Sequence, residues 1–126
     1  MPRVVLIADD NADNILLIRR ILRRSGMDLE IVEAHGGRDA LQLATEKLPE
    51  IILLDMKMPD MDGYQAATAI KAGETTKNIP VIAVTAQAMM GDREKALEAG
   101  CSEYITKPVD AALLIETLKR FLNEGK

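Results

Sequence analysis

The chain has 126 residues, 48% of them hydrophobic and 29% charged, which is enough for one globular domain that buries about two thirds of its unfolded surface. A net charge of -4, with two tyrosines and one phenylalanine as the only aromatic residues, argues against a nucleic-acid surface, which needs a basic face and often stacking platforms. No apolar run approaches the roughly 20 residues that cross a bilayer, and the N-terminus lacks the apolar region of a signal peptide, so we expect a cytoplasmic protein that does not bind membranes.

The first 50 residues predict two strands, each followed by a helix. Residues 4–8 form an apolar run without alternation, which is typical of a strand covered on both faces. Cap residues and apolar residues at helical spacing then predict a helix that begins after Asn11 and ends by Gly26. Residues 29–34 alternate as a strand near a sheet edge does, and Arg38–Lys47 returns to helical spacing.

The middle of the chain is organised around an apolar run that stops at an acid. Four aliphatic residues, Ile51–Leu54, run directly into Asp55, and Pro59 follows four positions later. We therefore expect a third buried strand with an aspartate at its carboxyl end, where open α/β sheets bind their ligands.

The rest of the chain continues to alternate helices and strands. Asp92 is expected to cap a short helix that Gly100 ends, and an apolar stripe runs along the last helix. The remaining predicted elements are the helix 64–72, the strand 79–85, the helix 93–99, the strand 101–106 and the helix 111–122.

Five strands that alternate with five helices predict a doubly wound parallel sheet in three layers, with right-handed crossovers. We expect residues 1–126 to form this single α/β domain. The initial Met1 and the short segment after the last predicted helix favour a complete stand-alone protein without a DNA-binding or enzymatic output domain. The alternative is a domain cut from a longer protein.

Polar residues follow or end four of the predicted strands: Asp9, Asp10, Asp55, Thr85 and Lys107. Because the carboxyl ends of parallel strands share one edge of a sheet, we expect these residues to converge. Three close carboxylates raise one another's pKa values unless a cation neutralises them, and ligands that are all oxygen favour a hard ion such as Mg²⁺. Lys107 can pair with a carboxylate or with a phosphoryl group.

This constellation suits phosphoryl transfer to a carboxylate. Asp55 would be the nucleophile, and Mg²⁺ and Lys107 would stabilise charge on the phosphoryl oxygens. Positioning of the reactants, rather than proton transfer, would supply most of the rate.

Four motifs carry a resemblance to a known family. They are Ala8-Asp9-Asp10-Asn11, the stretch LDMKMPDMDG at residues 54–63, Val84-Thr85-Ala86, and Tyr104-Ile105-Thr106-Lys107-Pro108. In this order and at this spacing, they resemble the receiver domain of two-component response regulators over nearly the whole chain. The resemblance is greatest to small stand-alone regulators of the DivK and CheY kind, and it implies a flavodoxin-like fold with strand order 2-1-3-4-5.

The resemblance also implies a role for each acidic residue. Asp55 matches the phosphoacceptor, which takes a phosphoryl group from a phosphohistidine of a sensor histidine kinase or a histidine phosphotransfer protein. Asp10 and Asp55 match the direct Mg²⁺ ligands, with the main-chain carbonyl of Lys57 as a third, and Asp9 acts largely through metal-bound water. Such a domain assists its own phosphorylation and dephosphorylation and is not an enzyme.

The switch residues are implied in the same way. Lys107 matches the lysine that contacts the phosphoryl group, and its bond to Pro108 is commonly cis in the family. Thr85 matches a hydroxyl that moves toward the phosphate, and Tyr104 an aromatic residue that turns inward with it. The fourth helix, fifth strand and fifth helix would form the face that binds a downstream protein target.

Two residues near the predicted site occupy positions at which members of the family vary. Lys57 lies two residues after the phosphoacceptor, and Gln87 lies two residues after Thr85. Because such positions flank the path of an attacking water, we expect the long cation and the amide to tune the lifetime of the phosphate.

Two other functions remain open. Aspartate-nucleophile phosphohydrolases of the haloacid dehalogenase type use a similar set of residues, but they require a second aspartate where this chain has Lys57, and they place the nucleophile in their first motif. An interaction module could also keep the fold without being phosphorylated.

The remaining reactive side chains suggest structural roles. We expect the only histidine, His35, to lie on the surface, and the only cysteine, Cys101, to fill a small buried space. Met89 and Met90 are either adaptable partner contacts or plugs of the core.

Overall fold

The computed structural model describes residues 2–86 and 90–122, which form alternating strands and helices. In chain order they are β1 (Arg3–Ala8), α1 (Ala12–Arg23), β2 (Leu29–Ala34), α2 (Gly37–Lys47), β3 (Ile51–Leu54), α3 (Gly63–Ala72), β4 (Val81–Thr85), α4 (Asp92–Glu98), β5 (Glu103–Thr106) and α5 (Ala111–Phe121).

The strands form one parallel sheet in the order β2-β1-β3-β4-β5. β1 and β3 lie side by side in the centre, where Ala8 is in register with Leu54, and Leu54 in turn with Ala83. The doubly wound fold and its strand order are therefore confirmed. The alternating strand β2 lies at the sheet edge, as its pattern predicts.

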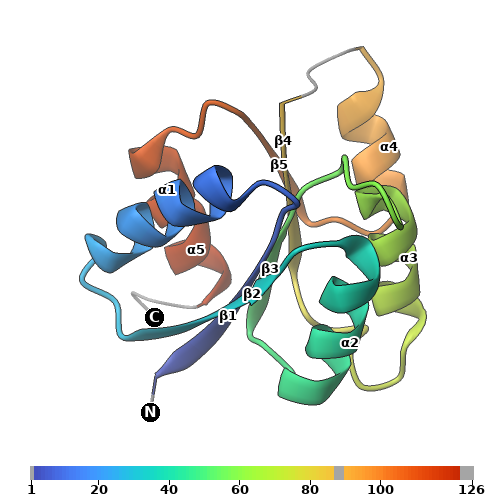
Figure 1. The fold of residues 1–126 in the computed structure, drawn as a ribbon, viewed down its shortest axis with the longest axis horizontal. Coiled ribbons are helices and arrows are strands. Elements are labelled where there is room, and N and C mark those ends of the chain that lie inside the picture. The colour runs from blue at the N-terminus through green and yellow to red at the C-terminus, as the bar shows by residue number, and fades with distance from the viewer. Residues whose placement is uncertain (1, 87–89, 123–126) are drawn as a thin grey trace.

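Helices cover both faces of the sheet, α1 and α5 one face and α2, α3 and α4 the other (Figure 1). The side chains of β3 point alternately into two cores: Ile51 and Leu53 pack in the core under α1 and α5, whereas Ile52 and Leu54 pack in the core under α2 to α4. None of the four is more than 1% exposed. Burial on both faces explains why β3 is apolar without alternation.

The last two strands begin later than the sequence pattern predicts. Pro80 has no N–H to donate, although its carbonyl still accepts from Ile52 N at 3.0 Å, so β4 begins at Val81 instead of residue 79. Cys101 N donates to Ala96 O at 3.0 Å and thus closes the end of α4, so β5 begins at Glu103 instead of residue 101.

Several helix boundaries also differ from the prediction by one to three residues, those of α1 and α4 among them. α1 ends at Arg23, and Gly26, with φ +82°, lies in the following turn. Asp92, expected as the cap of α4, is instead the first helical residue, because Gly91 occupies the cap position with φ 91°. Among the described residues, none of the helices is long and apolar enough to cross a membrane.

Candidate phosphoacceptor and metal site

Three of the predicted site residues directly follow a strand, and their backbone amides continue the hydrogen-bond ladder of the sheet. The three bonds run from Asp9 N to Ala34 O at 3.1 Å, from Asp55 N to Ala8 O at 2.9 Å and from Lys107 N to Thr85 O at 2.9 Å. The sheet itself therefore fixes the backbone positions of these three residues.

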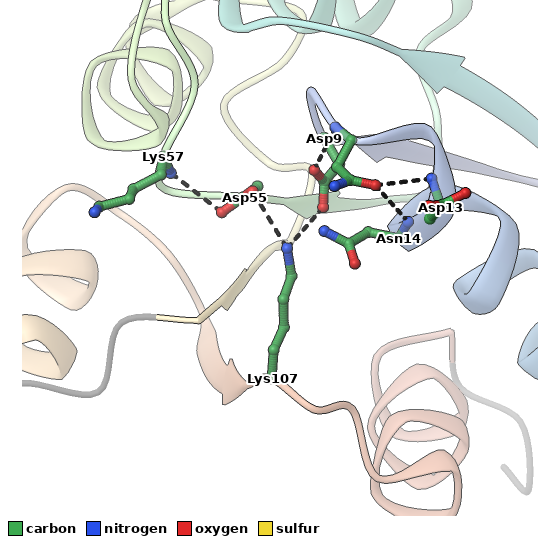
Figure 2. Close-up of polar contacts among 7 residues, drawn as sticks. Asp9, Asp13, Asn14, Asp55, Lys57 and Lys107 are labelled. Atoms are coloured by element: carbon green, nitrogen blue, oxygen red, sulfur yellow. Dashed lines mark hydrogen bonds and ion pairs between the residues drawn. The ribbon is translucent and has the colours of Figure 1, made fainter.

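The ammonium group of Lys107 lies between two carboxylates (Figure 2). Its Nζ is 2.8 Å from Asp9 Oδ2 and 3.3 Å from Asp55 Oδ2. The side chains of Lys107, Asp9 and Asp55 are only 14%, 3% and 8% exposed. The expected convergence of residues 9, 55 and 107 is present in the structure.

The other oxygen of each buried carboxylate accepts a backbone N–H. Asp9 Oδ1 accepts from Asn11 N at 2.9 Å, and Asp55 Oδ1 accepts from Lys57 N at 3.1 Å. Asn11 also caps α1, since its side chain accepts from the backbone N–H groups of Asp13 and Asn14. Each carboxylate is thus oriented by one backbone amide and one ammonium group.

Asp10 completes an acidic cluster. One carboxylate oxygen each from Asp9, Asp10 and Asp55 lies within 4.8 Å of the others, and Asp10 is exposed whereas the other two are buried. Hard oxygen donors close together, with an exposed side where water can complete the shell, fit Mg²⁺. Asp10 and Lys57 also line an open pocket of about 460 Å³ beside the site.

Burial and neighbouring charges shift the pKa values of Asp55 and Lys107. Burial raises the pKa of Asp55 and the nearby Asp9 charge adds to this, which together outweigh the Lys57 amide and the Lys107 ammonium. Burial acts to lower the pKa of Lys107, but the hydrogen bond to Asp9 and the charges of Asp55 and Asp9 raise it overall. Lys107 therefore remains a cation, whereas the folded protein disfavours the charged form of Asp55.

The predicted switch residues lie on neighbouring strands. Thr85 is the buried last residue of β4 and is in register with Thr106 of β5. Tyr104 of β5 is half-buried against the core under α2 to α4, and burial raises the pKa of its hydroxyl. The bond between Lys107 and Pro108 is cis, as the family resemblance implies.

Of the two residues expected to affect the phosphate lifetime, only one can be placed. The side chain of Lys57 is exposed and extends away from the Asp55 carboxylate (Figure 2). Gln87 lies outside the described residues, as does Met89. Met90 is fully exposed, so it does not plug the core.

The structural roles of His35 and Cys101 are confirmed. His35 is exposed at the end of β2. Cys101 is 5% exposed, and burial raises the pKa of its thiol to about 11, which keeps it protonated and unreactive at neutral pH.

Sequence reasoning missed the residues that hold the loop between β3 and α3. Gly63 N donates to Met56 O at 3.0 Å, and a Cβ at Gly63 would overlap the carbonyl oxygen of Asp55. Asp62 caps α3 and forms a reciprocal capping box with Gln65. The spacing of Asp62 and Gln65 is the signal that could have revealed this cap.

Buried carboxylates and a lysine at the carboxyl edge of a five-stranded parallel sheet define a flavodoxin-like α/β protein of the receiver type. Residues 5–119 match the family model described as "Response regulator receiver domain". The chain belongs to this family, whose members act in two-component phosphorelay signalling as phosphoacceptor domains rather than ordinary enzymes.

Individual relatives are similar to this chain over nearly its full length. The chain is 40% identical over 125 residues to the polar-differentiation response regulator DivK of Brucella anthropi, covering 99% of this chain and 100% of DivK. A putative response regulator from Chloroflexus aurantiacus has a TM-score of 0.91 at 29% identity and covers 98% of this chain and 100% of its own.

A third relative was solved with a metal ion. The receiver domain of sensor histidine kinase PA1611 from Pseudomonas aeruginosa has a TM-score of 0.89 at 34% identity, covers 98% of this chain and 100% of its own, and has a magnesium ion coordinated in its active site cleft.

Proposed function

We propose that residues 1–126 act as a single cytoplasmic receiver domain that accepts a phosphoryl group on Asp55 and passes the signal on by protein-protein contact. The donor is a phosphohistidine of a sensor histidine kinase or a histidine phosphotransfer protein. The observation that carries the proposal is the Asp55 carboxylate, buried at the end of the central strand β3 with Lys107 Nζ 3.3 Å away.

The transfer step needs little from the protein beyond positioning. An Asp55 carboxylate oxygen attacks phosphorus, the P–N bond breaks, and its electron pair stays on the imidazole nitrogen of the donor. The product on Asp55 is an acyl phosphate, and Lys107 is near enough to contact its oxygens. Thr85 would supply a hydroxyl to the same group when the domain switches.

Mg²⁺ fits this site through Asp10, Asp55 and the Lys57 carbonyl, with Asp9 acting through metal-bound water. When bound, it would offset the charge of the carboxylates and of the phosphoryl oxygens. The magnesium ion in the Pseudomonas aeruginosa receiver domain supports this assignment.

The output face would be α4, β5 and α5. One carboxylate of the edge strand β5 connects all three elements, because Glu103 pairs with Arg93 of α4 at 3.4 Å and with Arg120 of α5 at 2.8 Å. The neighbouring Tyr104 lies on the same strand. A phosphoryl group adds about -1.5 to -2 charge, which can bias the arrangement of this face for a downstream protein target.

The phosphohydrolase alternative receives less support. Its general acid would have to stand two residues after Asp55, where the chain has Lys57, whose side chain extends away from the carboxylate.

The test is the intact mass of the protein after incubation with Mg²⁺ and acetyl phosphate. We expect the wild type to gain one phosphoryl group, and a chelator to block the gain. Asp55→Asn should show no gain, whereas the exposed-carboxylate control Asp13→Asn should behave as wild type. An equal gain in Asp55→Asn would refute the assignment. Steady consumption of the donor without an adduct would indicate either fast self-dephosphorylation or a hydrolase. Mg²⁺ binding without either result would favour a docking module.

A further inference from the structure

Asp60 connects the loop after the phosphoacceptor to a different helix. This loop, residues 55–62, joins β3 to α3 and carries both Asp55 and the Lys57 carbonyl. Asp60 Oδ1 accepts from Gly37 N at 3.0 Å, and Asp60 Oδ2 accepts from Arg38 N at 3.1 Å. Both donors belong to the first turn of α2, more than 20 residues earlier in the chain.

α2 needs this contact because its own cap residue supplies none. Gly36 stands at the N-cap and makes no side-chain hydrogen bond. The first N–H groups of a helix have no partner within the helix, so a carboxylate from outside can satisfy them. The hydrogen bonds from the backbone N–H groups of Arg38 and Gly37 favour the charged form of Asp60 and so lower its pKa.

The loop and α2 also meet through their backbones. A Cβ at Gly37 would overlap the carbonyl oxygen of Met61, and a Cβ at Gly36 would lie 2.7 Å from Asp60 Oδ1. At its other end the loop is closed by the bond from Gly63 N to Met56 O at 3.0 Å. The segment that carries the Lys57 carbonyl is therefore held between two fixed points.

We propose that Asp60 is a positioning residue for the Mg²⁺ site: by binding α2, it fixes the loop that presents Asp55 and the Lys57 carbonyl to the ion. This rests on the proposed function of the site. Residues that orient metal ligands without touching the ion typically change metal affinity by 10–100-fold when removed. A role in helix capping alone would leave the affinity unchanged.

The experiment separates positioning from capping. Mg²⁺ affinity is obtained from the shift of the denaturant midpoint between chelator and increasing Mg²⁺, and stability from the midpoint in chelator alone. Four proteins are compared: wild type, Asp60→Ala, Asp39→Ala and the double variant Asp60→Ala/Gly36→Ser. Asp39 is the matched control, because it lies in the same first turn of α2 but accepts from His35 N at 3.2 Å instead of binding the loop.

The double variant gives α2 a cap of its own. Gly36 has φ -168°, an extended conformation open to serine, and removal of the Asp60 carboxylate frees the space that a Cβ needs. Serine at this position accepts from the first-turn N–H groups. Stability in chelator should therefore recover toward wild type, while the link to the loop stays broken.

We expect Asp60→Ala to bind Mg²⁺ about tenfold more weakly than wild type, Asp39→Ala to bind nearly as wild type, and the double variant to stay weak although its stability recovers. The inference is overturned if Asp60→Ala keeps wild-type affinity, if Asp39→Ala loses as much, or if affinity recovers together with stability in the double variant. If the wild type itself shows no Mg²⁺ shift, the proposed metal site fails and this inference with it.

Discussion

The charge of Asp55 is a cost that the folded protein carries when no metal is bound. Burial removes the carboxylate from water, and Asp9 repels it from a nearby position. Lys107 and the Lys57 amide offset this only in part, because the pKa of Asp55 remains above its ordinary 3.8. Asp55, for which we propose a chemical role, is thus expected to weaken the fold.

The first prediction is that Asp55→Asn stabilises the metal-free protein at pH 7. Because the pKa of Asp55 is raised by folding, its contribution to stability is fully present below pH 3.8 and is lost as the pH rises through its folded-state pKa. The advantage of the variant over wild type, measured as a denaturant midpoint in chelator, should therefore shrink as the pH is lowered toward 4.

Mg²⁺ should reverse this order. At a concentration about 100 times its dissociation constant, a ligand stabilises the folded state by about 2.7 kcal/mol, and Asp55→Asn should gain much less than wild type. Asp13→Asn, which changes an exposed carboxylate in the first turn of α1, is the control and should follow wild type. If Asp55→Asn is less stable than wild type in chelator at pH 7, the charge of Asp55 does not destabilise the fold and the prediction is wrong.

At the scale of elements, the site depends on the close approach of α3 to the end of β3. Gly63 begins α3, where alanine would usually be the better helix former by up to about 1 kcal/mol. A Cβ there, however, would overlap backbone atoms of Asp55 and Met56. Backbone atoms cannot turn away as a flexible side chain can, so the overlap should outweigh the gain in helix propensity.

We accordingly predict that Gly63→Ala lowers the free energy of unfolding by about 3 kcal/mol, measured in urea. Gly26→Ala is the comparison, since nothing lies within 4 Å of a Cβ there and only the positive φ of +82° opposes it. That variant should lose about 1 kcal/mol. Equal losses in the two variants would show that packing at the end of β3 is looser than described.

Element types were predictable from sequence to the extent that the pattern was local. The apolar run of β3 and the asparagine cap of α1 both depend on neighbouring residues, and both were predicted. The predicted start of β4 was wrong. The apolar run extends through Ile79 and Pro80, whereas the hydrogen-bond ladder of the sheet needs an N–H, which proline lacks. The contact of Asp60 with α2 joins residues 23 apart and has no local pattern to reveal it.

The acidic site was predictable for a similar reason. Once the strands are placed, a parallel sheet brings their carboxyl ends to one edge, so the meeting of residues 9, 55 and 107 follows from topology. The sequence does not say how Lys107 divides its contacts. In the structure its shorter contact is to Asp9 rather than to Asp55.

At the scale of the whole molecule, one sheet separates two hydrophobic cores. Ile70 of α3 is fully buried in the core under α2 to α4, and Leu114 of α5 is fully buried in the core under α1 and α5. Because neighbouring residues of each central strand belong to different cores, neither core can be lost without exposing the sheet that supports the other.

We therefore predict that Ile70→Ala and Leu114→Ala each lower the free energy of unfolding by about 3 kcal/mol, with a single transition and an unchanged dependence on denaturant. Leu17→Ala, at a site 46% exposed on α1, is the control and should cost less than 1 kcal/mol. A two-step transition in either core variant would show that the two faces unfold separately.

The position of Lys107 between two carboxylates has a consequence for the entropy of binding. A free lysine side chain loses about 1.5–2 kcal/mol of rotational freedom when it is fixed in one geometry. Here the chain is already held by Asp9 and Asp55 before any ligand arrives. A phosphoryl group on Asp55 would therefore meet an ammonium group whose ordering had taken place during folding, so little of the contact energy would be lost in arranging it.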